Sequence, residues 1–242
     1  MQQQNTAVQT AIPAQPVTVE RPLYNPVNSG KLVNPGTGRA NLAATADQPR
    51  GTQSNKWASD HSKQTVLQQH CDFFDPDNDS IVWPLDTYRG FHDLGFNILL
   101  SVTAMFIIHA SFSYATVPGY LPDPFFRLHL KNIHKAKHGS DSGIFDNEGR
   151  FIPQKFEDFF SKYADGKDGL TMEDVLKALK GQRLLMDFTG WIGAFFEWLS
   201  IYIFLWPEDG MMKKEDIRRV LDGSIFSEAA SKRAGRKKTK AT

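Results

Sequence analysis

The sequence predicts a mainly α-helical protein made of EF-hand-like helix–loop–helix units with one intact metal loop, plus an apolar hairpin that rests on a membrane. Asp75, Asp77 and Asp79 alternate with other residues, which predicts the metal loop. A mostly apolar stretch at 95–117 predicts a long helix, and three prolines that follow within seven residues predict a sharp turn at its end. Together these features predict a helical protein with one cation site and one lipid-facing segment.

The composition narrows the class of protein. The 242 residues carry a net charge of +1 and the sequence pI is about 7.8, so we expect no general attraction to nucleic acid. A single cysteine, Cys71, excludes an intramolecular disulfide and is typical of a reducing compartment. No signal peptide is expected from the first twenty residues. Residues 1–60 are polar and interrupted by prolines, so we predict a disordered or loosely attached arm there.

The metal loop lies in the predicted EF-hand unit, residues 61–93. An EF-hand supplies oxygen ligands from loop positions 1, 3, 5, 7, 9 and 12. Asp75, Asp77 and Asp79 fill the first three of these, the carbonyl of Ile81 would be the seventh, and Asp86 would close the loop. Such crowded carboxylates need a hard divalent cation, so we predict calcium here; the alternative is an acidic surface turn without an ion.

Two loop positions differ from the usual pattern. Position six is Ser80 in place of glycine, and the positive φ needed there costs a non-glycine residue about 1 kcal/mol. Position twelve is Asp86, which is one methylene shorter than the usual glutamate. We therefore predict six-coordinate binding, weaker calcium affinity and better tolerance of magnesium. Helices are expected at 60–74 and 87–95 on either side of the loop.

Residues 94–126 form the predicted apolar segment. No Lys, Arg, Asp or Glu occurs between Asp93 and Asp123, but Asn97 and His109 make the segment a poor bilayer span. A helix that ends in a proline turn favours a hairpin lying in a lipid surface, and the alternative is a buried core helix. The residues predicted to anchor it in the membrane are Pro118, Pro122 and Pro124.

The rest of the chain, residues 127–227, is predicted to contain degenerate EF-hand-like loops. A second loop aligned at 144–155 would begin with Ile144 and end with Lys155, so it could not hold a cation. Asp-Gly turns at Asp168 and Asp209, each before a helix, predict two further silent loops, although chance similarity explains them nearly as well.

A second apolar stretch, residues 186–206, contains eight aromatic side chains. It is expected to be either an interfacial helix or the wall of an apolar pocket. The C-terminal residues 228–242 are basic, and we predict a disordered tail there.

Several long motifs resemble those of the caleosins. The resemblance runs in order from about residue 65 to residue 226, and it excludes the N-terminal arm and the basic tail. The motifs that carry it are L-Q-Q-H from Leu67, P-L-D-T-Y-R-G-F from Pro84, S-Y-A-T-V-P-G-Y-L-P-D-P-F-F from Ser113, N-I-H-K-A-K-H-G-S-D-S from Asn132 and D-N-E-G-R-F from Asp146.

The resemblance implies a function and a set of cofactors. Caleosins are calcium-binding proteins of lipid droplets, and many are haem peroxygenases that transfer oxygen from a hydroperoxide to unsaturated fatty acids or other apolar acceptors. It implies non-covalent haem b, with the family's haem-associated histidines at His70 and His138. It also implies a location on the cytosolic face of the lipid-droplet monolayer or endoplasmic reticulum, with a proline knot as anchor and homo-oligomers as one option.

Sequence spacing alone leaves the histidine chemistry open. His70 and His138 are 68 positions apart and no C-x-x-C-H motif is present. One of the pair would be the proximal iron ligand and the other a labile ligand or distal base, in an order the sequence does not fix. His134 and His138, four residues apart, could instead bind a transition metal. The alternative function is a non-enzymatic calcium-responsive coat or tether of lipid droplets, and a soluble calcium sensor is a weaker third reading.

Overall fold

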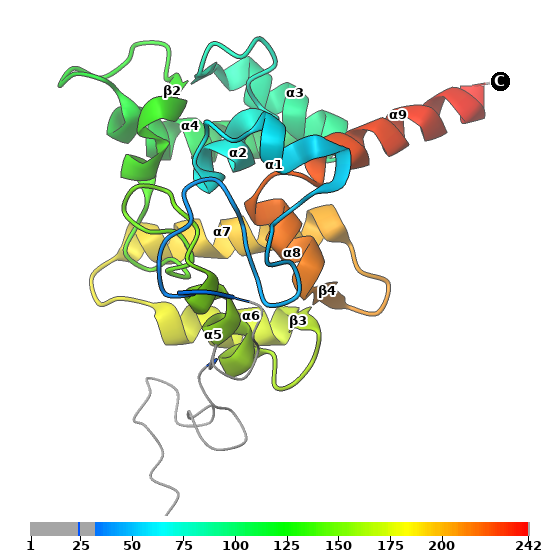
Figure 1. Ribbon diagram of the computed structural model, residues 1–242. Coiled ribbons are helices and arrows are strands. Elements are labelled where there is room, and N and C mark those ends of the chain that lie inside the picture. The colour runs from blue at the N-terminus through cyan, green and yellow to red at the C-terminus, as the bar shows by residue number, and fades with distance from the viewer. Residues whose placement is uncertain (1–23, 25–31, 242) are drawn as a thin grey trace, which may run out of the picture.

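The computed structural model describes Tyr24 and residues 32–241, with side chains up to residue 235. It is mainly helical, with a few short strands, as the sequence predicts. The helices form an upper and a lower group, and each group contains one two-stranded antiparallel ladder (Figure 1). The predicted arm at 1–23 and 25–31 lies outside the described residues.

The upper group contains the metal loop. Its helices are α2 (Val66–Asp72), α3 (Pro84–Leu94), α4 (Ile98–Thr116) and the 3-10 helix η3 (Leu130–Ala136). Strand β1 (Ile81–Val82) pairs with β2 (Leu128–His129). Local sequence explains the boundaries: Thr65 and Gln68 form a capping box that starts α2, Pro84 is the first residue of α3, and Gly95 ends α3 at a φ of 107°.

The lower group repeats this plan. It contains α5 (Pro153–Tyr163), α6 (Met172–Gln182), α7 (Phe188–Leu205) and α8 (Lys214–Leu221). Strand β3 (Gly169–Thr171) pairs with β4 (Met211–Lys213), so the two predicted Asp-Gly turns lead into one ladder. Aromatic side chains fill the interior, where the rings of Phe159 and Trp198 stack with centroids 5.5 Å apart.

Residues 144–155, predicted to form a second, silent loop, do not pair with the metal loop in the described structure. Phe145 and Phe151 form an antiparallel bridge, and Arg39 pairs with Phe151 from the other side. The segment that faces the metal loop across β1 and β2 is instead the proline-rich stretch 117–129. That stretch has no acidic repeat, so its sequence does not predict that it pairs with the metal loop.

Both ends of the described chain are more ordered than the sequence predicts. In segment 32–60, which includes η2 (Ser54–Lys56) and α1 (Trp57–Asp60), Ala43, Ala44 and Thr52 are buried. The guanidinium of Arg218 donates to the Ala43 carbonyl and to the Thr52 hydroxyl, which fastens this segment to α8. The expected tail forms α9 (Phe226–Ala241), because Phe226 packs into an aromatic cluster and starts the helix.

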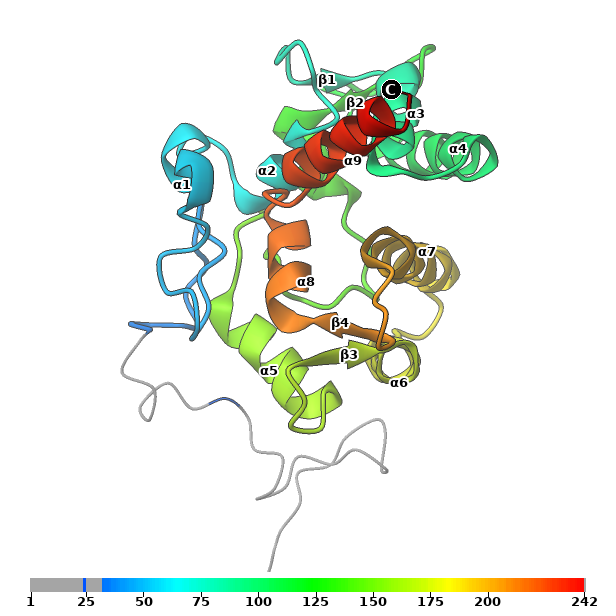
Figure 2. The ribbon, with the colours of Figure 1, turned by 90° about the vertical axis from the view of Figure 1, so that its right-hand side faces the viewer.

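The helices α4 and α7 lie on the same side of the molecule, at the right of Figure 2 and behind the other elements in Figure 1. Each is long and apolar enough to cross a membrane, yet only 17% of each apolar window is buried. The alternative that the 94–126 segment contains a buried core helix is therefore wrong: α4 exposes its apolar side.

Candidate functional site

The metal loop joins α2 to α3. Among the residues that the structure describes, Asp75, Asp77 and Asp79 place carboxylate oxygens within 4.8 Å of one another. Asp75 is buried, whereas Asp77 and Asp79 are exposed. The arrangement offers a hard cation three oxygen ligands on one side of a tight turn.

Asp75 is the electrostatic centre of this group. Its Oδ2 accepts a hydrogen bond of 2.9 Å from the Ser80 amide, and its buried Oδ1 has no partner in the described chain. Burial, together with Asp77 and Asp79, raises the pKa of the Asp75 carboxyl to about 6. An unpartnered buried oxygen and crowded carboxylates are the features that a bound divalent cation would relieve.

The two unusual loop positions behave differently from each other. Ser80 takes a φ of 67°, as expected of the sixth loop position. Asp86, expected to close the loop, lies outside the carboxylate group: its Oδ2 accepts from the Trp83 amide at 3.1 Å, and Arg89 lies 3.9 Å from its other oxygen. In this structure Asp86 caps α3. Ile81, the seventh position, belongs to β1 and pairs with His129.

The ladder connects the metal loop to the proline-rich segment. Besides the β1–β2 pairs, the Leu130 amide donates to the Ser80 carbonyl at 2.9 Å. His109 of α4 forms a second connection, because its Nε2 lies 2.8 Å from the Thr87 hydroxyl and its Nδ1 lies 2.6 Å from the Phe126 carbonyl. Hydrogen bonds therefore connect the metal loop, α3 and the segment after the prolines into one unit.

The three prolines follow α4, as predicted. Tyr120 and Leu121, which lie between Pro118 and Pro122, are 96% and 83% exposed. The turn is closed by Asp123, whose carboxylate accepts from the Phe125 amide and from Arg127. The proline turn therefore exposes two apolar residues, Tyr120 and Leu121, at its tip, and the hydrogen bonds of Asp123 hold the base of the turn in place.

His70 lies on α2, five residues before Asp75. Its Nδ1 lies 2.7 Å from the Val220 carbonyl, which selects the tautomer that carries the proton on Nδ1 and leaves a lone pair on Nε2. Burial lowers the pKa of the ring, so the neutral form is favoured. A histidine with one nitrogen fixed by a carbonyl and the other available is the form that holds metals.

His138 follows η3 in an extended segment. Its ring nitrogens are buried, and neither has a hydrogen-bond partner in the described part of the chain. Nε2 lies 3.5 Å from Oε1 of Glu197 on α7, which is the distance of an ion pair, and Glu197 raises the pKa of the ring. Gly193, one turn earlier on α7, faces the same ring: a Cβ there would lie 3.5 Å from it.

Glu197 connects the two histidines. It raises the pKa of His138 as a close partner and adds a smaller upward contribution to the pKa of His70. Glu197 is therefore in contact with His138, whereas it acts on His70 only through its charge. The sequence analysis assigns no role to Glu197. A usable signal was present, because Glu197 is the one charged residue of α7.

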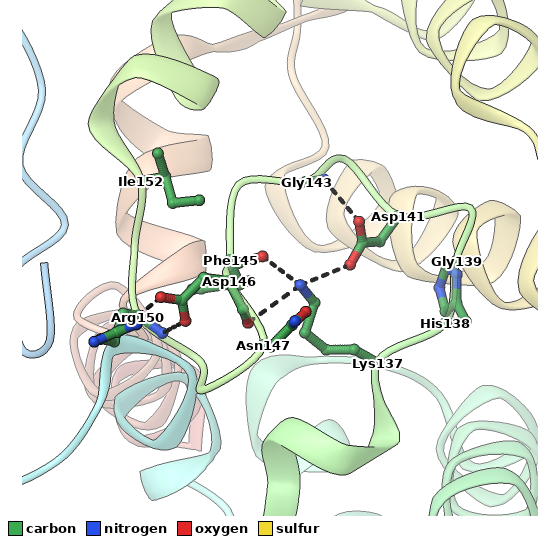
Figure 3. A pocket seen from close by; sticks show the side chains of 10 residues that line it. All are labelled: Lys137, His138, Gly139, Asp141, Gly143, Phe145, Asp146, Asn147, Arg150 and Ile152. Carbon is green, nitrogen blue, oxygen red and sulfur yellow. Dashed lines mark hydrogen bonds and ion pairs between the residues drawn. The ribbon is translucent and has the colours of Figure 1, made fainter. Parts of the chain in front are cut away.

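Two other sequence expectations near His138 can be assessed. The helix η3 ends at Ala136, so His134 and His138 do not share a helix face as a transition-metal pair would require. A cavity of about 630 Å³ has His138 at its edge (Figure 3), and Lys137, Asp141, Asp146 and Arg150 make its wall polar. Lys137 is paired with Asp141 and Arg150 with Asp146, so the charges in this wall are neutralised in pairs.

The comparisons with known proteins identify the family of this chain. The family model described as "Caleosin related protein" matches residues 62–230. The chain belongs to the caleosin family. No solved structure matches it.

Curated relatives agree with this assignment. The chain is 42% identical over 224 residues to "Peroxygenase" of Lilium longiflorum, which covers 92% of each chain. It is 38% identical to "Probable peroxygenase 4" of Arabidopsis thaliana, over 72% of this chain and 90% of the relative. It is also 32% identical to "Probable inactive peroxygenase-like protein" of the same plant, over 60% of this chain and 70% of the relative.

Proposed function

We propose that this protein is a haem-dependent peroxygenase, an oxidoreductase that passes one oxygen atom from a fatty acid hydroperoxide to an unsaturated fatty acid or another apolar acceptor. In balance, the hydroperoxide becomes an alcohol and the acceptor gains one oxygen as an epoxide or hydroxyl group. The observation that carries the proposal is the buried His138 ring, whose Nε2 lies 3.5 Å from the Glu197 carboxylate and whose nitrogens make no hydrogen bond in the described chain. The two relatives named as peroxygenases support it.

The two histidines fit a haem group in different roles. His70 is the better iron ligand, since the Val220 carbonyl orients its ring and leaves Nε2 free to coordinate. His138 is the better proton carrier, since Glu197 favours its protonated form. When bound, haem would supply the iron that activates the O–O bond.

Side chains of the protein are proposed to carry out the proton transfer and to bind the acceptor. The proton of the hydroperoxide must move from one oxygen to the other, and Nε2 of His138 can accept and return it while Glu197 stabilises the charged ring. The acceptor must be apolar, because the neighbouring helix α7 offers aromatic and aliphatic side chains.

The acidic loop is proposed as a calcium site that supports this reaction centre. Asp75, Asp77 and Asp79 would bind the ion, and the carbonyl of Ile81 is proposed as a further ligand. Asp86 would join only if it left its cap on α3. Since α2 carries His70 and enters the loop, metal binding would hold the helix that orients this residue.

The protein is proposed to act on the surface of lipid droplets or of the endoplasmic reticulum, anchored by α4 and the turn at Pro118, Pro122 and Pro124. The exposed apolar residues of α4 and Tyr120 support a lipid partner. The second candidate, a calcium-binding tether without turnover, draws support from the relative whose name includes "inactive".

Absorbance and turnover test the proposal together. Purified protein in detergent, with His70→Ala and His138→Ala beside it, is titrated with haemin and then given a fatty acid hydroperoxide and an unsaturated acceptor. We expect a Soret band that His70→Ala shifts or weakens, and oxygen transfer that both variants lose. No Soret band in the wild type would refute the enzyme and favour the tether.

A further inference from the structure

The N-terminal half of helix α7 exposes large apolar side chains to solvent. The buried residues of the helix are Gly190, Ala194 and Trp198, spaced by four. Large apolar side chains point outward instead: Phe188 is 54% and Ile192 59% exposed. A helix of a soluble domain places its large apolar residues inside, so this face lacks a partner in the structure as it stands.

The turn that leads into α7 extends this face. Leu184, Leu185 and Met186 are consecutive, and they are 53%, 89% and 72% exposed. Met186 has a φ of 65°, a left-handed backbone that a non-glycine residue adopts at a cost. Three exposed apolar residues on a constrained turn match what the proline turn presents with Tyr120 and Leu121.

The two tips lie at the same edge of the molecule. In Figure 1 the green segment after α4 and the yellow segment before α7 both lie at the left, and in Figure 2 α4 and α7 lie together at the right. The two helices therefore lie on the same side of the molecule (Figure 2), and both expose large apolar residues: on α4, Leu99 and Phe106 are at least 70% exposed.

The margin of the α7 face carries the chemistry of a lipid headgroup contact. The guanidinium of Arg183 lies 4.9 Å above the Trp191 ring, and the indole of Trp191 donates to the Leu184 carbonyl at 2.7 Å. Lys180, three residues before Arg183 in the last turn of α6, is also exposed. Aromatic and cationic side chains beside an apolar tip suit the boundary between phosphates and acyl chains.

We propose that Leu184–Met186 and the outer face of α7 form a second lipid-contacting element, which together with α4 and the proline turn rests the protein on a phospholipid surface. The inference rests on the proposed lipid location and adds a contact in the C-terminal half of the chain. Continuity with the α4 face and the cations at the margin identify the occupant as phospholipid. Glu197 belongs to this helix, and His138 lies 3.5 Å from its carboxylate, so the proposed reaction centre would adjoin the lipid surface.

Vesicle binding tests this surface. Full-length protein is mixed with phosphatidylcholine–phosphatidylserine vesicles, and the bound fraction is measured by flotation. Two double variants and one single variant are compared with the wild type. Leu185→Ser with Met186→Ser alters the new tip, Tyr120→Ser with Leu121→Ser alters the proline turn, and Val33→Ser is the control. Val33 is 74% exposed in segment 32–60, on the opposite side of Figure 2.

We expect each tip variant to reduce the partition coefficient at least about tenfold, because a buried Leu or Met side chain stabilises a contact by more than one factor of ten. The control should bind as the wild type does. Full binding by the Leu185 and Met186 variant, with loss in the Tyr120 and Leu121 variant, would overturn this inference and leave the lipid location standing. Full binding by both would overturn the lipid location as well.

A label at the tip gives a second readout. Leu185→Cys can be labelled selectively with a polarity-sensitive dye, because burial raises the pKa of the native Cys71 thiol to about 12. The fluorescence should shift to the blue on vesicles, whereas a dye on Val33→Cys should not. A shift that occurs without vesicles and grows with protein concentration would assign the face to a second copy of the chain, contrary to the proposal.

Discussion

Asp75→Asn should stabilise the metal-free protein while abolishing its response to calcium. Without an ion, the folded protein holds the Asp75 carboxyl at a pKa of about 6, above its usual 3.8. A raised carboxyl pKa means that ionisation destabilises the fold, so the penalty is full above about pH 6 and disappears as the pH falls toward 4. Asparagine has no charge, and its side-chain oxygen can still accept from the Ser80 amide.

The shift in the pKa of Asp75 sets the size of the stabilisation expected for Asp75→Asn. About two pKa units correspond to a ceiling of about 3 kcal/mol. Asp77 and Asp79 are exposed to water, which screens their repulsion, so we expect about 1–2 kcal/mol in favour of the variant at pH 7. For a chain of this size that is a rise in melting temperature of roughly 2–8 °C.

The assay is thermal unfolding at pH 7 and pH 4.5, in EDTA and in calcium. The wild type in EDTA should gain stability relative to the variant as the pH falls. Calcium at one hundred times its dissociation constant should stabilise the wild type by about 2.7 kcal/mol and leave Asp75→Asn unchanged. Asp77→Asn, at an exposed ligand position, is the matched control and should weaken calcium binding with a smaller change in EDTA. An Asp75→Asn protein that is less stable than wild type in EDTA would refute this reasoning.

Three further predictions follow from single contacts. Glu197→Gln should lower hydroperoxide turnover by roughly a hundredfold and leave haem content unchanged, as steady-state kinetics and haem absorbance would measure; loss of haem would instead make Glu197 a structural residue. Gly223→Ala should destabilise the fold by about 2 kcal/mol or more, because Gly223 has a φ of 76° and a Cβ there would clash with the Gln69 carbonyl beside His70; urea unfolding measures it, and an unchanged midpoint would contradict it. Ser80→Gly should stabilise the metal-free protein by about 1 kcal/mol in the same assay, since Ser80 has a positive φ; a lower midpoint would show that its φ is not strained.

The parts of the fold that the sequence predicts are those with local signals. The aspartate repeat predicts the carboxylate group, and the long apolar runs predict α4 and α7. The Asp-Gly turns at Asp168 and Asp209 predict helix starts, and the structure adds that their strands pair. Each of these depends on residues within one continuous stretch of the sequence.

The parts that could not be predicted depend on distant partners. Residues 32–60 read as polar, yet they are held by Arg218, whose position on α8 no local pattern gives. Asp86 has the right spacing for a metal ligand, but its cap on α3 competes for the same oxygens. The approach of Glu197 to His138 requires α7 to lie beside the segment after η3, which only the tertiary fold determines.

The inward side of α4 has a consequence for how the protein matures. Ser113 donates to the Arg127 carbonyl, Thr116 to the Ser113 carbonyl, and His109 bridges two elements, so these three polar side chains are hydrogen-bonded within the protein. The lipid is therefore not required to complete these hydrogen bonds, and the apolar outer side is a separate solvent-facing layer. Folding of α4 onto its neighbours and the proposed contact of its apolar side with lipid are therefore separate events, and the first can be completed in water.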